Sequence, residues 1–189
     1  MMDIIKIMLI GKDMKNMNIK QKIDMIIDSF LVVLGIFIII LGILKYDNIK
    51  TIFVSSMFAY ALLNFIQYFL TRKSNDMEGL YTTLACLLVG IADIYFPFNN
   101  NLVLSVSIMI WALIMSIIKF IKADYYNDRK DKMWKLRVIS LILFIVIAIL
   151  TSVSLNYNHN VQVMIIGYFF LIHGILELID PITNYLIGK

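Results

Sequence analysis

The chain has 189 residues, of which 61% are hydrophobic and 16% charged, and its mean hydropathy is +0.85. Soluble domains are about half apolar, so this composition excludes a soluble globule, and its wealth of Ile, Leu, Phe and Met excludes a disordered chain. The single cysteine, Cys86, excludes an intrachain disulfide, and no Cys/His spacing suits a zinc site, so we expect neither a metal nor a cofactor.

Six apolar runs approach or reach the length of a membrane-spanning helix, since about 20 helical residues cross a hydrocarbon core of about 30 Å. In chain order they are 29–44, 51–70, 80–96, 102–121, 138–155 and 161–179. Residues 141–150 are apolar on every side, whereas the strands of a membrane barrel would alternate apolar and polar residues. The sequence therefore predicts an all-α membrane protein with six transmembrane helices over residues 29–179.

Two flanking segments lie outside the six spans. Residues 1–28 are expected to form a cytoplasmic N-terminal segment without a signal peptide, and residues 180–189 a cytoplasmic tail. Residues 1–10 are apolar apart from Asp3 and Lys6 and are too short to span a membrane. An interfacial helix and a frayed terminus both remain open for them.

Positive charges predict the orientation, because Lys and Arg near span ends stay in the cytoplasm. With the N-terminus inside, all but Lys45 and Lys50 of the 17 Lys and Arg lie on or near the cytoplasmic side. We expect a multi-pass protein of the plasma or inner membrane with both termini cytoplasmic. The basic segment 119–137 is expected to meet anionic lipid headgroups rather than nucleic acid, because its aromatic residues are typical of a membrane interface. The oligomeric state is not determined by the sequence.

The six spans form three hairpins of equal length, 29–70, 80–121 and 138–179, joined inside each hairpin by short Asn-rich turns. Aligning their second helices superposes Asn64, Ser116 and Gly174. Three residues later the same alignment superposes Gln67, Lys119 and Glu177. Because the units share one orientation, a pseudo-symmetry axis is expected along the membrane normal.

The hairpin repeat, the helix end 169–179 (FFLIHGILELI) and the motif Trp134-Lys135-Leu136 resemble the HdeD-like acid-resistance membrane proteins over residues 29–179. The resemblance implies a non-enzymatic membrane protein associated with acid or general membrane stress. It supplies no catalytic residues. The chain departs from the family pattern at Asn64 and Ser116, where the family has glycine, and it keeps an outer-turn proline only at Pro97.

Five residues near one end of the spans form a candidate polar cluster: Asn64, Gln67, Lys119, His173 and Glu177. Ionisable residues inside a span are costly, so each raises a functional hypothesis. One hypothesis is that Lys119 and Glu177 form an ion pair with the Gln67 amide as partner. The alternative is that the long side chains snorkel separately to the headgroups.

His173 lies one turn before Glu177, on the same helix face, and Gly174 is expected to let a neighbouring helix approach closely. A histidine changes charge near mildly acid pH, so the pair predicts a pH-responsive bundle. The alternative is a neutral histidine that donates one interhelical hydrogen bond.

Asp93 is placed at the outer interface, near Tyr95 and Pro97, where we expect water to solvate it rather than an ion pathway to use it.

No Walker loop, HExxH, GxSxG or dinucleotide motif is present, so no enzyme is expected. Two functions remain: a structural or regulatory stress protein, and a small channel or transporter with a polar cytoplasmic vestibule. A continuous polar route would favour transport.

Overall fold

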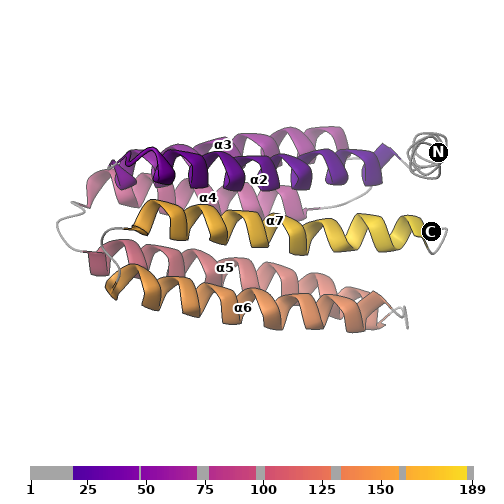
Figure 1. The fold of residues 1–189 in the computed structure, drawn as a ribbon. Helices are drawn as coiled ribbons and strands as arrows, with labels where there is room; N and C mark the ends of the chain where they lie inside the picture. Colours follow the sequence, from indigo (N-terminus) through magenta and orange to yellow (C-terminus); the bar gives the residue numbers. More distant parts are fainter. Residues whose placement is uncertain are drawn as a thin grey trace, which may run out of the picture.

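The structure, a computed structural model, describes residues 19–46, 48–71, 77–96, 101–128, 133–157 and 161–186. Within these ranges every long element is an α-helix, and there is no strand. The helices are α2 (Ile19–Ile43), α3 (Ile49–Thr71), α4 (Glu78–Tyr95), α5 (Asn101–Asp128), α6 (Met133–Tyr157) and α7 (Gln162–Leu186) (Figure 1). All six are long and apolar enough to cross a membrane, which confirms the predicted fold class. The predicted interfacial segment 1–10 lies outside the described residues.

Several helices extend beyond the predicted spans. The first, α2, begins at Ile19 rather than at residue 29, and α5 ends at Asp128 rather than at residue 121. The last, α7, continues through Pro181 to Leu186. Pro181 has no N–H to donate to the carbonyl of Glu177, one turn earlier, so the helix continues there without that hydrogen bond. Each extension adds charged turns to the bundle.

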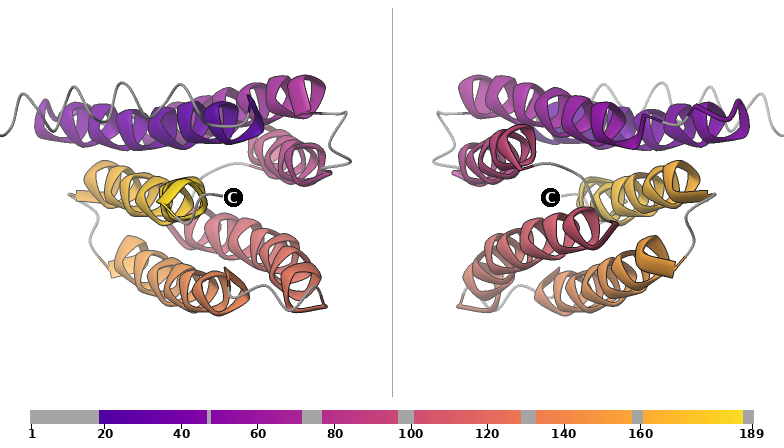
Figure 2. Two further views of the ribbon diagram at one scale, coloured as in Figure 1. Left: turned by 90° about the vertical axis from the view of Figure 1, so that its right-hand side faces the viewer. Right: turned by 90° about the vertical axis from the view of Figure 1, so that its left-hand side faces the viewer.

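The helices form a closed ring in three layers, with α2 and α3 on one side, α4 and α7 in the middle, and α5 and α6 on the other side (Figures 1 and 2). Around the ring, each helix contacts the next one in the sequence, and α7 contacts α2. The most extensive contacts are α2 with α7, α3 with α4, and α5 with α6, all of which join different predicted hairpins. The hairpin boundaries themselves stay a prediction.

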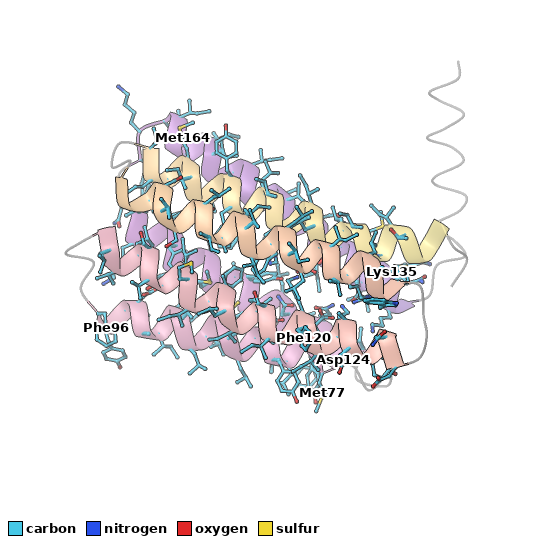
Figure 3. All side chains as sticks on the ribbon, turned by 90° about the horizontal axis from the view of Figure 1, so that it is seen from below. Met77, Phe96, Phe120, Asp124, Lys135 and Met164 are labelled. Carbon is cyan, nitrogen blue, oxygen red and sulfur yellow. The ribbon has the colours of Figure 1, made fainter. Side chains whose placement is uncertain are left out.

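Both ends of the described chain lie at the same end of the bundle, where α2 begins and α7 ends (Figure 1). We call this the terminal end. The labelled Asp124 and Lys135 lie at the terminal end, and Phe96 and Met164 lie at the opposite end (Figure 3).

Glycines bring α2 and α7 into close contact. A Cβ atom on Gly167 would lie 2.7 Å from the backbone nitrogen of Ile39 and 3.0 Å from the carbonyl oxygen of Gly35. A Cβ atom on Gly174 would lie 2.8 Å from the backbone nitrogen of Val32. Side-chain carbons do not accept such short contacts, so these glycines permit the two backbones to approach. The predicted close approach at Gly174 is confirmed, and the neighbouring helix is α2.

Aromatic rings fill the middle of the bundle. Trp111, Phe144, Phe169 and Phe170 are almost completely buried, and the ring of Trp111 packs against the other three at centroid distances of 5.6 to 6.3 Å. Large apolar side chains also cover the outside of every helix. The outer surface of the bundle is therefore suited to contact lipid rather than water. We call the four rings, together with Tyr60, the aromatic layer.

Candidate functional site

Three ion pairs lie between the helices in the terminal half of the bundle. Lys122 of α5 pairs with Glu78 of α4, and Lys119 of α5 pairs with Glu177 of α7. Arg137 of α6 pairs with Asp180 of α7 at 2.9 Å. All six side chains are mostly withdrawn from solvent, and a buried charge is tolerated only when an opposite charge compensates it. The hypothesis that Lys119 and Glu177 form an ion pair is confirmed, and the alternative of separate snorkelling is not observed.

A small cavity lies among these ion pairs. It is lined by Glu78, Lys119, Lys122, Arg137, Ser140, Leu141, Glu177 and Asp180. Its volume of about 20 Å³ accommodates one water molecule, and its lining offers the several polar partners that a buried water requires. Its dimensions exclude an organic ligand in this conformation.

The amide residues of the predicted cluster have other partners. Gln67 donates from Nε2 to Oδ1 of Asp24 on α2 at 2.6 Å, so the predicted position of its amide on the Lys119–Glu177 pair is wrong. Asn64 is buried and donates from Nδ2 to the carbonyl oxygen of Tyr60, one turn earlier in its own helix, at 2.8 Å. Asn64 therefore belongs to the packing of α3 rather than to the ion pairs.

His173 is the most deeply buried titratable side chain beside the ion pairs. Its Nε2 atom lies 3.7 Å from Oε1 of Glu177, which places the predicted pair on one helix face. Its ring is enclosed by those of Tyr60, Trp111, Phe144 and Phe169, at centroid distances of 4.7 to 6.3 Å.

Neither ring nitrogen of His173 has a hydrogen-bond partner within the part of the chain that the structure describes. The alternative of a neutral histidine that donates an interhelical hydrogen bond is therefore not observed. A polar nitrogen buried without a partner is unusual and costly, and it calls for an explanation such as a functional role.

The aromatic layer closes the ion-pair region from the opposite end of the bundle. Along α5, Lys119 is followed two turns deeper by Trp111 and one further turn away by Ser107. Trp111 donates from Nε1 to Sγ of Cys86 on α4 at 3.2 Å, which fixes the indole across the bundle. The buried centre between the two polar regions is thus aromatic, and the polar route through the described residues is interrupted there.

Asp93 lies beyond the aromatic layer, near the opposite end of α4. Its side chain is buried, with 2% of its surface exposed, so the prediction that solvent covers it is wrong. Ser107 of α5 donates its hydroxyl to Oδ1 of Asp93 at 2.5 Å, and Oδ2 is buried without a partner among the described residues. The hydroxyl of a neighbouring helix, which a linear sequence does not reveal, compensates the carboxyl group.

The basic segment 119–137 divides into two groups in the structure. Lys119, Lys122 and Arg137 form ion pairs between the helices. Contact of the segment with anionic headgroups stays a prediction. Lys135 is exposed at the terminal end (Figure 3). Residues 129–132 of this segment lie outside the described residues.

Four members of the ion-pair region were missed by sequence reasoning: Glu78, Lys122, Arg137 and Asp180. They lie just outside the predicted spans and were therefore assigned to the cytoplasmic segments. A signal was nevertheless present, because Lys122 and Asp180 follow Lys119 and Glu177 by three residues, which is one helical turn. The two lysines of one helix thus occupy positions equivalent, in the predicted repeat, to those of the two acidic residues of the other helix, and the charges are opposite. Within the described ranges, no three His, Cys, Asp or Glu residues are grouped to hold a metal ion.

Comparison with protein families adds one match. Residues 81–153 match the short repeat of unknown function (DUF308). The matched repeat spans most of α4, all of α5 and most of α6, and so includes Asp93, Lys119, Lys122 and Arg137. No curated protein and no solved structure matches the chain. The chain is thus a membrane protein of six apolar helices that contains a DUF308 repeat.

Proposed function

We propose that this chain is a non-enzymatic protein of the plasma or inner membrane, with both termini in the cytoplasm, that serves in acid or general membrane stress. The matched DUF308 repeat is the family domain of the HdeD-like membrane proteins, which supports the resemblance drawn from the sequence. The observation that carries the proposal is His173, a buried histidine with unpartnered nitrogens that lies 3.7 Å from a carboxylate.

Protonation of His173 changes the balance of charges at Glu177. An imidazolium donates from Nε2, so Glu177 then has two cationic partners, His173 and Lys119. In acid, Glu177 therefore shares its charge between Lys119 and His173, which weakens the ion pair that joins α5 to α7. The packing of the terminal half of the bundle changes as a result.

Fluorescence of Trp111 tests this proposal, because its ring lies 5.4 Å from that of His173 and a protonated imidazole quenches an indole. The chain has two tryptophans, so a Trp134→Phe background leaves Trp111 as the single reporter. Burial among the rings disfavours the imidazolium, so acidification is carried from about pH 8 to about pH 4, and quenching is expected in the acid part of this range in lipid nanodiscs. The quench should disappear in His173→Gln and persist in the control His159→Gln. An identical titration in His173→Gln would contradict the proposal.

A small channel or transporter remains the second candidate, because the ion pairs surround a water-sized cavity that resembles a vestibule. The aromatic layer argues against conduction, since it separates this vestibule from Asp93. Proteoliposomes that contain a pH dye distinguish the two functions. Proton flux above that of empty liposomes, lost in a His173→Gln, Glu177→Gln double variant, would establish transport. Flux equal to that of empty liposomes would support the stress protein.

A further inference from the structure

The ion pairs form a row of polar side chains, called the file below, that leads from the terminal end of the bundle to His173. The exposed side-chain surface falls inward along two helices: on α5 from 23% at Lys122 to 12% at Lys119, and on α7 from 17% at Asp180 through 15% at Glu177 to 0% at His173. Polar groups therefore extend inward from solvent by steps of one helical turn and end at the imidazole ring.

The water-sized cavity completes this file. It lies between the outer pairs and Glu177, and the Glu177 carboxylate both lines the cavity and lies 3.7 Å from Nε2 of His173. A carboxylate that contacts a water on one side and an imidazole on the other is suited to pass a proton between them.

From the opposite end, the access to His173 is blocked. The rings of Trp111, Phe144 and Phe169 pack directly against the imidazole, and each is at most 1% exposed. Asp93, the buried carboxyl group of that end, is engaged by Ser107 on the far side of these rings. A water chain requires polar partners; Phe144 and Phe169 offer none, and the N–H of Trp111 is already donated to Cys86.

We propose that His173 exchanges its proton with the terminal end of the bundle alone, through the water-sized cavity and the carboxylate of Glu177. In this step a hydrated proton in the cavity transfers to Glu177, which forms an O–H bond. That bond then breaks as Nε2 of His173 gains the proton. One proton moves, Glu177 is restored as a carboxylate, and no electron is transferred.

The charged and titratable neighbours of His173 come from five helices. From α2, the carboxyl group of Asp28 interacts electrostatically with Tyr60 and Lys119. Glu177 follows His173 on α7, and Lys119 of α5 pairs with Glu177. Tyr60 of α3 packs edge-on against the imidazole, and Cys86 of α4 lies behind Trp111. The contact from α6 is the ring of Phe144. Of these groups, Glu177 alone both lines the cavity and lies within 4 Å of the imidazole.

This inference rests on the proposed function, in which His173 takes up the proton, and its test therefore depends on the side of the membrane. The full chain, in the Trp134→Phe background, is reconstituted in two fractions of opposite orientation, separated by the accessibility of a C-terminal tag. The external buffer is then dropped from about pH 7.5 to about pH 4 in a stopped-flow mixer while Trp111 fluorescence is recorded, because burial disfavours the charged imidazole.

Prompt quenching is expected when the terminal end faces the external buffer. When it faces the vesicle lumen, we expect only slow quenching, which follows the gradual acidification of the lumen. Prompt quenching from the opposite end, or equal quenching from both, would overturn the inference and leave the proposed function intact. Loss of any His173-dependent quench in nanodiscs would instead refute the proposed function. The two failures are therefore distinguishable.

A cavity variant tests the route without removing a charge. Ser140→Ile is expected to fill the water-sized cavity and slow the prompt quench by about tenfold or more, a barrier increase of about 1.4 kcal/mol. The matched control, Ser154→Ile, makes the same change on the same helix more than three turns away, toward the opposite end, and should leave the rate unchanged. Equal rates in the wild type and Ser140→Ile, with the fold intact, would refute the cavity route.

Discussion

Substitution of Gly167 by alanine tests the close contact between α2 and α7. The new Cβ atom would lie 2.7 Å from the backbone nitrogen and from Cγ1 of Ile39. Ordinary contacts begin at about 3.4 Å, so the two helices must separate by about 0.7 Å at this point, the difference between these distances. Because one of the opposing atoms belongs to the backbone, a side-chain rotation cannot relieve the contact.

Overpacking of this kind costs about 1–3 kcal/mol, while alanine in a helix is favoured over glycine by up to about 1 kcal/mol. A matched control removes the second contribution. A Cβ atom on Gly90 of α4 would lie 3.5 Å from its nearest neighbours, which is an ordinary contact, so Gly90→Ala gains the helix preference without the overpacking. Gly167→Ala should therefore be less stable than Gly90→Ala by about 1–3 kcal/mol.

Equilibrium unfolding in mixed detergent and SDS micelles, followed by tryptophan fluorescence, measures this difference in the free energy of unfolding. Equal stabilities of the two variants would refute the reasoning, because they would show that α2 and α7 are not held at the described separation. A more stable Gly167→Ala would refute it as well.

Two further predictions use the same unfolding assay. Lys119→Met and Glu177→Gln each leave one charge unpaired and should each cost about 3–5 kcal/mol, while the double variant should cost clearly less than their sum; additive costs would contradict a direct ion pair. Ser107→Ala removes the hydroxyl that donates to the buried carboxyl of Asp93 and should cost about 1–3 kcal/mol. The control Ser116→Ala removes a bond to its own helix backbone and should change stability little; a similar loss in both variants would contradict this assignment.

The number and type of the helices could be predicted from the sequence because lipid requires long apolar segments whose backbone polar groups pair internally. The helix ends could not. Hydropathy treats a charged residue as the end of a span. In the structure, however, α2 includes Asp24, which accepts a hydrogen bond from the Gln67 amide, and α5 continues past Lys122, which pairs with Glu78 of α4. The extent of a helix here depends on tertiary partners, which a linear pattern does not contain.

The candidate site was predictable where the repeat encoded it. The equivalent positions of Lys119 and Glu177 gave their ion pair, and the spacing of one turn gave the proximity of His173 to Glu177. The partners Glu78 and Arg137 depend on the rotation of α4 and α6 about their axes, which composition does not specify. Asp93 is buried for the same reason, because the rotation of α5 brings Ser107 to it.

The contact between α2 and α7 also has a consequence for the order in which the bundle assembles. During synthesis, α2 enters the membrane long before α7, and residues 44–161 must follow before its most extensive partner exists. Until then the face of α2 that carries Gly35 and Gly42, which packs against α7 in the finished bundle, lacks that partner. The ring therefore closes late, and a chain whose synthesis stops before α7 leaves this face of α2 without its partner.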